Sequence, residues 1–427
     1  MAIDNKDKKV LKSSIEREQN EVACSAECEK IKGSKNLNVP PLRFPEFSGE
    51  WEKKKLKDVC TFYSGGTPSS SNKDYYFGDI PFIRSGELHE RSTELFISED
   101  GLNNSSAKMV YKGDLLLALY GATSGDIAIS QIEGAINQAI LCINTKHSKE
   151  YIKAIWQKHV QKILQTYLQG GQGNLSADIV KNISFYFTSS KEQDKLANFI
   201  RLLDERIATQ NKIIEKYESL IQAMCDTLIE SEQHKVELAF SDFGKSYSGL
   251  SGKNAGDFDE GCPYITYMNV YQNQIIDTTN VGLVKINKTE QQSVVHYGDI
   301  LFTLSSETPE EVGMGAVYLG ETYPLYLNSF CFGIHIIDEN KIFPPFLAFY
   351  VSTKSFRKAV FPLAQGSTRF NLQKSDFMKK VFPFPTVERQ NKIYSVLKAY
   401  SDRLSVEKSI AKLLREQKNY LLRQLFI

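Results

Sequence analysis

Side chains suited to recognising another molecule are concentrated in three polar loops that contain glycine. Amide and guanidinium groups can contact adenine and guanine edges through paired hydrogen bonds, and glycine lets a backbone approach a phosphate closely. The last two loops occupy equivalent places in the two halves of the chain, which favours a binding role over an ordinary connection. The candidate nucleic-acid contacts in these loops and nearby segments are Ser64, Gly65, Gly66, Thr67, Arg84, Tyr120, Gln169, Gly170, Gln172, Asn174, Ser248, Gln365, Ser367, Thr368, Arg369 and Asn371.

Residue patterns for catalysis are weak by comparison. Six histidines fall at no spacing typical of a metal site or a hydrolytic triad. The sequence Phe343-Pro344-Pro345-Phe346 is similar to the tail of an amino-methyltransferase motif, but Phe343 cannot accept the hydrogen bond that holds the target amine. No P-loop or glycine-rich cofactor loop is present. We therefore expect a non-catalytic chain without a metal or a cofactor of its own.

Composition indicates a globular protein with room for two or three domains. The 427 residues are 41% hydrophobic and 11% aromatic, and their net charge is only +1, so nucleic-acid binding requires local clusters among the 52 basic residues. Lysines and arginines near the last polar loop, Lys354, Arg357, Lys358, Lys374, Lys379 and Lys380, could neutralise phosphates. Seven scattered cysteines, no apolar signal core and no membrane-length apolar run favour a cytoplasmic protein without membrane contact.

The elements that must position these loops are organised around a long helix expected over residues 189–229. Apolar residues alternate at spacings of three and four, which is typical of a narrow seam that needs a partner helix. About 40 such residues would make a rod of roughly 60 Å. The seam residues are Leu196, Ile200, Leu203, Ile207, Ile214, Tyr217, Ile221 and Leu228.

A partner helix is expected near the end of the chain, over residues 387–425. Placing Leu196 on Ile393, an offset of 197 (393 − 196), aligns a second seam with the first and also aligns Gln193 with Gln390. Glu407 and Lys418 interrupt that seam, so its pairing should loosen or shift its register. The second seam consists of Ile393, Leu397, Leu404, Leu414 and Leu421.

The segments between the helices also repeat in outline. Gly298-Asp299-Ile300-Leu301 corresponds to Gly113-Asp114-Leu115-Leu116, which indicates an internal duplication whose loops differ in length. We expect a polar tail over 1–38, a first module over 39–188, a central helical spacer over 189–232, a second module over 233–385 and a C-terminal helical spacer over 386–427. The fold class is α+β: two α/β modules in a pseudo-two-fold repeat, joined by two long antiparallel coiled-coil helices.

This pattern resembles the specificity subunit of type I restriction-modification enzymes. The resembling stretches are Leu42-Arg43-Phe44-Pro45-Glu46-Phe47 with Gly49-Glu50-Trp51, Ile80–Arg84, Gly113–Leu116, Tyr120–Gly125, Asn137-Gln138, and Glu192-Gln193 through Asp204–Ile207. The second half departs from it, with Glu388-Arg389-Gln390 in place of the Glu-Gln pair and Ser305-Ser306-Glu307-Thr308 in place of the Tyr-Gly-Ala-Thr loop.

The resemblance implies two target-recognition domains that read a bipartite, asymmetric site on double-stranded DNA. It also implies docking of two methyltransferase (modification) subunits and association with restriction/translocase subunits. S-adenosylmethionine, ATP and Mg are then expected on those partners. Two alternatives stay open: a coiled-coil scaffold with two protein-binding domains and no direct DNA recognition, and a solitary modification enzyme.

Overall fold

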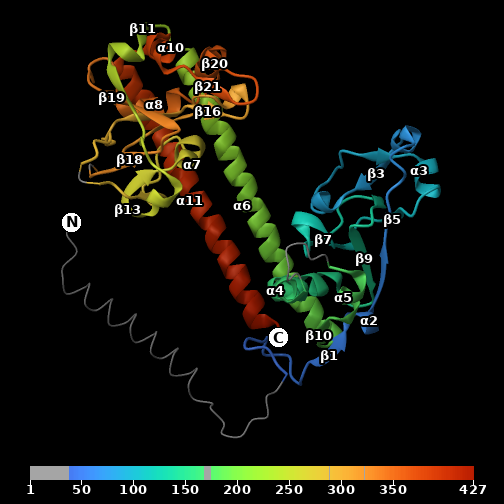
Figure 1. Cartoon of the computed structure of the whole chain (residues 1–427). Coiled ribbons are helices and arrows are strands. Elements are labelled where there is room, and N and C mark those ends of the chain that lie inside the picture. The colour runs from blue at the N-terminus through green and yellow to red at the C-terminus, as the bar shows by residue number, and fades with distance from the viewer. Residues whose placement is uncertain (1–37, 168–174, 288, 322) are drawn as a thin grey trace, which may run out of the picture. The chain divides into compact units, whose positions relative to one another are not determined.

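The computed structural model describes residues 38–167, 175–287, 289–321 and 323–427 (Figure 1). The predicted tail over 1–38 lies almost entirely outside the described residues. The chain divides into two compact units, one reaching to Glu205 and including Leu414–Ile427, the other comprising Arg206–Leu413. Within the described residues, no helix is both long enough and apolar enough to cross a membrane.

The first unit is built around a four-stranded antiparallel sheet with the strand order β2-β9-β6-β7. Strand β6, one of the two central strands, is apolar throughout and buried on both faces. Leu115 and Leu117 pack under helix α4, while Leu116 and Ala118 face a second sheet. This alternation follows from the two-residue period of a strand. The bounds are β2 Cys60–Ser64, β6 Leu115–Ala118, β7 Ile127–Ile129, β9 Ile140–Thr145 and α4 Lys149–Tyr167.

The remaining elements of the first unit complete its core and close its ends. The second sheet has the order β4-β3-β8-β5, with β3 and β8 parallel, and strand β1 pairs antiparallel with β10. Trp51 and Tyr151 are buried beside Phe426. The bounds are β1 Glu52–Lys55, α2 Leu56–Val59, β3 Ile80–Ile83, β4 Phe96–Ile97, α3 Glu99–Asn103, β5 Lys108–Val110, β8 Gly134–Ile136, α5 Ala177–Asn182 and β10 Ser184–Phe187.

The second unit repeats this arrangement of strands and helices. Its main sheet has the order β12-β19-β15-β17, which matches the first sheet strand for strand, and β11 pairs with β22 as β1 pairs with β10. Helix α8 packs under Ile300 and Phe302 of β15 in a core rich in phenylalanine. The bounds are β11 Lys235–Ala239, β12 Gly244–Ser248, β15 Ile300–Thr303, β17 Gly315–Val317, β19 Cys331–Ile336, α8 Pro344–Tyr350, α9 Lys354–Val360, α10 Lys374–Lys379 and β22 Val381–Pro385.

Two smaller sheets lie beside this main sheet in the second unit. One has the order β14-β13-β18 and the other the order β16-β21-β20. The second of these sheets carries the predicted polar segment Gln365–Asn371. The bounds are β13 Phe258–Ile265, α7 Tyr267–Gln272, β14 Gly282–Val284, β16 Ser305–Ser306, β18 Tyr326–Leu327, β20 Ala364–Gln365 and β21 Phe370–Leu372.

The two long helices are α6, Ser190–Glu230, and α11, Val387–Leu425. In the first unit the start of α6, with Leu196 and Ile200, packs with the end of α11. In the second unit Ile221, near the end of α6, packs in one core with Leu397, near the start of α11. The helices therefore run antiparallel, and the expected fold class is confirmed. Of the predicted seam, Leu196, Ile200, Ile221, Ile393, Leu397 and Leu414 are buried, whereas Leu203, Ile207, Ile214, Tyr217, Leu228, Leu404 and Leu421 are half-buried.

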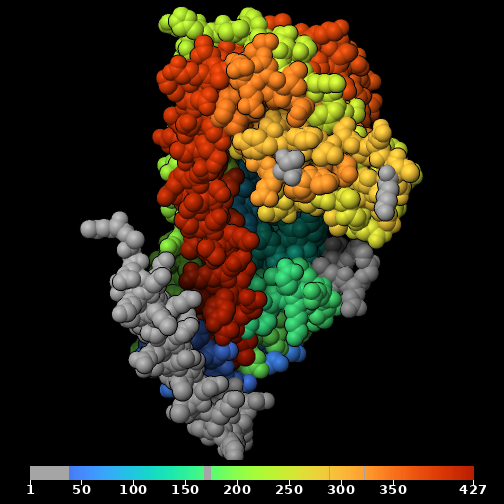
Figure 2. Space-filling model, turned by 90° about the vertical axis from the view of Figure 1, so that its left-hand side faces the viewer, coloured from blue at the N-terminus to red at the C-terminus, as the bar shows by residue number. Residues whose placement is uncertain are grey.

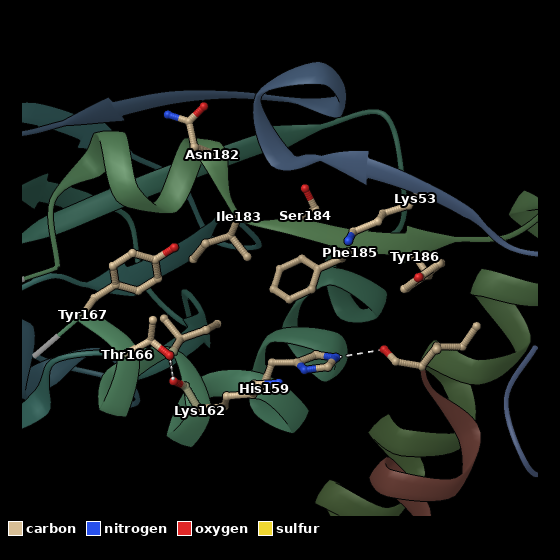
Figure 3. Close-up of a pocket in the computed structure, with 12 residues that line it drawn as sticks. Lys53, His159, Lys162, Thr166, Tyr167, Asn182, Ile183, Ser184, Phe185 and Tyr186 are labelled. Atoms are coloured by element: carbon tan, nitrogen blue, oxygen red, sulfur yellow. Dashed lines mark hydrogen bonds between the residues drawn. The ribbon is translucent and has the colours of Figure 1, made fainter. Parts of the chain in front are cut away.

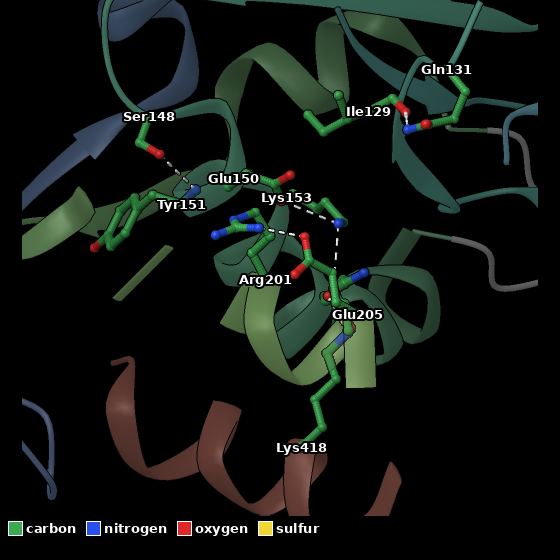
Figure 4. Close-up of polar contacts among 11 residues, drawn as sticks. Ile129, Gln131, Ser148, Glu150, Tyr151, Lys153, Arg201, Glu205 and Lys418 are labelled. Atoms are coloured by element: carbon green, nitrogen blue, oxygen red, sulfur yellow. Dashed lines mark hydrogen bonds and ion pairs between the residues drawn. The ribbon is translucent and has the colours of Figure 1, made fainter. Parts of the chain in front are cut away.

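Polar residues within the helix seam have polar partners. Gln210 of α6 donates to the Glu407 carboxylate at 2.6 Å. In the first unit the ammonium group of Lys418 lies 2.6 Å from Asp204 and that of Lys153 lies 3.4 Å from it. Figure 4 shows Lys153 reaching from α4 and Lys418 from α11 toward this part of α6. Glu407 and Lys418 thus join the two helices by hydrogen bonds and ion pairs where the sequence led us to expect looser packing.

Candidate nucleic-acid interface

In the second unit the polar segment Gln365–Asn371 folds as a hairpin against strand β16. Gln365 pairs with Asn371 across the hairpin, and Asn371 pairs in turn with Ser305. Gly366 turns the hairpin at a φ of +139°, and a side chain there would collide with the carbonyl of Arg369. The sequence analysis treated the segments Ser305–Thr308 and Gln365–Asn371 separately, and the pairing of β16 with β21 brings them together in one small sheet.

A pocket of about 290 Å³ opens beside this hairpin. Arg369 lies over the Phe330 ring at 6.0 Å, and Phe330 is exposed. The rings of Tyr267 and Tyr271, which also line the pocket, are stacked 5.9 Å apart. The lining residues are Tyr267, Met268, Tyr271, Ser305, Ser306, Glu307, Glu311, Phe330 and Arg369.

The chemistry of this pocket suits a nucleobase better than a phosphate. Exposed aromatic and thioether groups offer stacking surface, and the Arg369 guanidinium can donate two parallel hydrogen bonds to guanine. The negative charges of Glu307 and Glu311 disfavour the binding of a phosphate in this pocket. Their carboxylate oxygens can instead accept a hydrogen bond from the amino group of cytosine. The Tyr271 hydroxyl donates to Glu311 at 2.7 Å, which raises the pKa of that phenol and fixes the carboxylate beside the pocket.

Leu372 directly follows the polar loop of the second unit and Leu175 stands at the equivalent place in the first, and both make an equivalent backbone hydrogen bond. In the second unit the Leu372 amide donates to the Leu304 carbonyl at 2.8 Å, and in the first the Leu175 amide donates to the Leu119 carbonyl at 3.0 Å. Leu119 directly precedes the candidate residue Tyr120, which is half-buried. Of the other candidates, Gln169, Gly170, Gln172 and Asn174 lie outside the described residues.

The first glycine loop of the first unit meets a second loop through its side chains. Thr67 donates to the Gln138 side-chain oxygen at 2.6 Å, so segments distant in sequence share one surface. Ser64, at the end of β2, is exposed. Gly65 and Gly66 serve packing, because side chains there would collide with Ile136 and Ser106. Their absent side chains thus admit neighbouring protein atoms, which accounts for both glycines without a phosphate.

The remaining candidate residues differ in how free their side chains are. The Arg84 guanidinium pairs with Glu87 at 3.0 Å and Glu94 at 2.6 Å, so these carboxylates compete with any DNA contact. Ser248 is exposed at the end of β12 and accepts from the Lys374 ammonium group at 3.3 Å. Ser367 and Thr368 are exposed in the turn beside Arg369.

Arg357, expected to face phosphates, has a structural role. Its guanidinium donates to the carbonyls of Glu310, Val312 and Gly313 at 2.6–2.8 Å. Burial lowers its pKa, although arginine remains protonated. A phosphate at Arg357 would have to compete with these three carbonyls for the guanidinium. Three converging carbonyls have no sequence signature, so spacing alone could not have shown this role.

A second hollow, of about 490 Å³, was not foreseen from the sequence (Figure 3). It lies in the first unit between α4 and β10, with Lys53 and Lys162 among its lining residues. His159 projects toward it and hydrogen-bonds the Ile427 carbonyl at 2.8 Å, as Figure 3 shows, while burial lowers its pKa. Lys53 and Lys162 give this hollow positive charge, and Phe185 contributes an apolar side chain to its lining.

Comparisons with known proteins match both halves of the chain. The family model described as "Type I restriction modification DNA specificity domain" matches residues 48–219 and again 242–416. The MjaIX specificity subunit of a type I restriction enzyme from Methanocaldococcus jannaschii is 22% identical over 391 residues, which cover 83% of this chain and 88% of that protein. The MjaVIII specificity subunit from the same organism is 21% identical over 397 residues, covering 86% and 89%. The solved S subunit of a type I restriction-modification system from M. genitalium has a TM-score of 0.53 at 16% identity, covering 91% of this chain and 99% of that chain, a likeness that concerns the fold alone.

Proposed function

The chain belongs to the type I restriction-modification DNA specificity family, and from that premise we propose that each of its halves reads one part of a split DNA sequence. The observation that carries this proposal is the repeated architecture: the same sheet order recurs, and an equivalent backbone hydrogen bond joins Leu175 to Leu119 in one unit and Leu372 to Leu304 in the other. Because the loops differ in sequence on a common framework, they suit two different half-sites.

The test of this proposal is an exchange of one module. The chain is produced with type I methyltransferase partners in cells that lack other adenine methylation, and the methylated sequences are mapped. Replacing residues 39–188 by the corresponding module of a relative should alter one half-site and leave the other unchanged. A change in both half-sites, or methylation that does not depend on this chain, would contradict the proposal.

We also propose that the long helices hold the half-sites at a set spacing. Helix α6 has 41 residues, about 60 Å at roughly 1.5 Å per residue, and α11 has 39. Seven residues removed from each helix preserve the seam and shorten it by about 10 Å. The methylated sequences should then show half-sites closer together, and unchanged spacing would contradict a measuring role for the helices.

The outer faces of the helices are the proposed docking surface for two methyltransferase subunits. Figure 2 shows α11, in red, with outward side chains uncovered over much of its length. Candidates for the docking contact are the apolar side chains that remain exposed on the two helices, because an apolar patch with a polar rim is typical of an interface. They are Leu202 and Leu220 on α6 and Val396, Tyr400, Val406, Leu413 and Tyr420 on α11.

In this proposal the chain performs no catalysis. Methyl transfer from S-adenosylmethionine and the steps that use ATP and Mg belong to methyltransferase and restriction/translocase partners, and the complex works in the cytoplasm where its DNA lies. The Phe343–Phe346 segment supports this division, because Phe346 is fully buried and the Phe343 amide donates to Gln390 at 2.8 Å. The alternative of a protein-binding scaffold predicts no shift of labelled DNA in a gel at any salt concentration when methyltransferase partners are present.

A further inference from the structure

In the second unit two histidines and an aspartate meet at one end of the main sheet. His296 lies in the turn before β15, Asp299 directly precedes that strand, and His335 lies in β19. Potential ligand atoms of the three residues all lie within 4.8 Å of one another, and the two imidazole rings are 5.0 Å apart. The sequence predicted no metal site because His296 and His335 are far apart in the chain, but the pairing of β15 with β19 brings them together.

The Asp299 carboxylate is fully buried and held in a fixed orientation. One of its oxygens, Oδ2, accepts from the Tyr247 hydroxyl at 2.6 Å and from the His296 amide at 2.9 Å. The other, Oδ1, lies 2.7 Å from Nδ1 of His335. Outer partners that fix one carboxylate oxygen while the other faces an imidazole are typical of the surroundings of a metal-ligating carboxylate.

The repeat of the chain supplies an internal comparison. Asp114 occupies the same turn in the first unit and accepts from the Tyr111 amide at 2.8 Å, but its other oxygen pairs with the Lys149 ammonium group at 2.9 Å. The strand pairing places Asn144 of the first unit where His335 stands in the second. The first unit therefore neutralises its aspartate with a lysine. In the second, histidines take the places of Tyr111 and Asn144.

Charge neutralisation is the step that points to a ligand. Among the described residues, His335 is the sole ion-pair partner recorded for Asp299. A buried carboxylate needs a cationic partner, and the imidazole nitrogens that converge on Asp299 are ligands that a metal ion can use. We propose that His296, Asp299 and His335 bind a divalent transition-metal ion of the zinc class. Two imidazole nitrogens and one carboxylate oxygen suit Zn²⁺, Co²⁺ or Ni²⁺ and leave a fourth position for water.

The bound ion would neutralise Asp299 and join the turn before β15 to β19. His335 Nδ1 and Asp299 Oδ1 need to separate only slightly to share an ion, because ligands at about 2.0–2.2 Å from zinc lie somewhat over 3 Å apart. His296 is exposed, so the ion can enter from solvent. This site is independent of the proposed reading of DNA.

The test uses the full chain, stripped of metal with a chelator and titrated with Zn²⁺ by calorimetry and with Co²⁺ by visible absorption. We expect one ion per chain at this site and a higher Tm in its presence. His296→Ala removes a ligand at an exposed position and should weaken that binding by about 100-fold or more, beyond what the loss of an outer partner costs. The Tm increase should vanish with it.

Two variants serve as matched controls. His234→Ala removes another exposed histidine of the second unit, and His89→Ala disrupts a histidine–aspartate pair, with Asp126 at 2.9 Å, in the first unit. Both should bind as the wild type does. If His335→Ala does not fold, His296→Ala and His296→Gln still decide the question. Absence of binding, or binding that survives loss of His296, would overturn the proposal, the latter by placing the ion on other ligands.

Discussion

Gln210 of α6 and Glu407 of α11 hydrogen-bond at 2.6 Å, although 197 residues separate them. The same offset aligns the first helix with the second, so these residues occupy equivalent positions in the duplicated chain. In a two-fold pair, equivalent positions meet only where the axis passes. Both side chains are at least nine-tenths buried, which makes them a polar layer on the pseudo-two-fold axis of the helix pair.

Loss of one member of this polar layer should destabilise the protein more than loss of both. Glu407→Leu leaves the Gln210 amide without its carboxylate partner and deprives Arg403 of its ion pair, so we expect a loss of about 1–3 kcal/mol in the free energy of unfolding. The double variant Gln210→Leu with Glu407→Leu should recover wild-type stability or exceed it, because a buried polar pair is often no more stabilising than apolar packing. Urea unfolding monitored by helical circular dichroism measures both, and a double variant as unstable as the single one would contradict this account.

A second relationship explains one departure of the sequence from its repeat. The Glu192 carboxylate, at the start of α6, accepts hydrogen bonds from Nε and Nη2 of Arg43, both at 2.7 Å. At the equivalent position of α11 stands Arg389, which donates to Glu232 at 2.6 Å. An ion pair therefore stands at the start of each long helix, but α6 contributes the acidic side chain and α11 contributes the basic one.

The two pairs should differ in strength because they differ in burial. Glu192 is 1% exposed and also accepts from the Thr188 hydroxyl, whereas Arg389 is 44% exposed. We expect Glu192→Gln to lower the free energy of unfolding by about 3 kcal/mol, as loss of a buried charge partner does, and Arg389→Gln by less than about 1 kcal/mol. Calorimetric or urea unfolding compares them directly. Equal losses would mean that burial does not set the strength of these pairs.

Local periodicity made the helices and the duplication predictable from the sequence. The seam repeats over five heptads of α6, and the same seam and the Gly-Asp turn recur in the second half of the chain, so local patterns showed both the helices and the duplication. The seam itself drifted toward the end of α6, where Cys225 and Ile229 are buried and Leu228 only half-buried. There the helix enters the core of the second unit, which covers a wider face than a partner helix does.

Partners set by tertiary structure were not predictable. The carbonyl acceptors of Arg357 are 44–47 residues away in sequence, so its contacts could not be foreseen. His335 meets His296 and Asp299 only through the pairing of β19 with β15. The glycine of the first polar loop has a similar explanation. Gly65 approaches the backbone at Ile136, a neighbour that the sequence could not identify.

Cysteine reactivity should follow burial. Burial raises the pKa of Cys142 to about 11 and those of Cys225 and Cys331 to about 12, so almost no thiolate exists at pH 8. Cys262 is only half-buried. We expect iodoacetamide to modify Cys262 well before these three thiols in the folded protein, as measured by peptide mass spectrometry. The control is the urea-unfolded chain, in which all four should react at similar rates. Early modification of Cys225 or Cys331 would show that their core opens readily.

The His89–Asp126 pair should give a small pH-dependent contribution. The hydrogen bond to Asp126 raises the pKa of His89, so the pair stabilises the fold fully below the ordinary histidine pKa of about 6.5 and loses this effect as pH rises through the higher folded pKa. Because both side chains are partly exposed, His89→Asn should cost only about 0.5 kcal/mol at pH 5.5 and almost nothing at pH 9. Urea unfolding of wild type and variant at both pH values measures the difference. A larger loss at pH 9 than at pH 5.5 would reverse the expected sign.

Arg369 offers the sharpest test of base reading in the second unit. Its guanidinium lies beside the exposed Phe330 ring at the mouth of the pocket, where a base could stack while its edge accepts two hydrogen bonds. We expect Arg369→Ala to weaken binding to the correct half-site by about 1–3 kcal/mol and to leave binding to unrelated DNA nearly unchanged. Arg369→Lys keeps the charge but loses the planar fork, so it should resemble alanine in specificity and wild type in salt dependence. Competition binding with DNA altered in one half-site at a time, in the presence of methyltransferase partners, measures these effects. A uniform loss of affinity on every sequence would make Arg369 a phosphate contact.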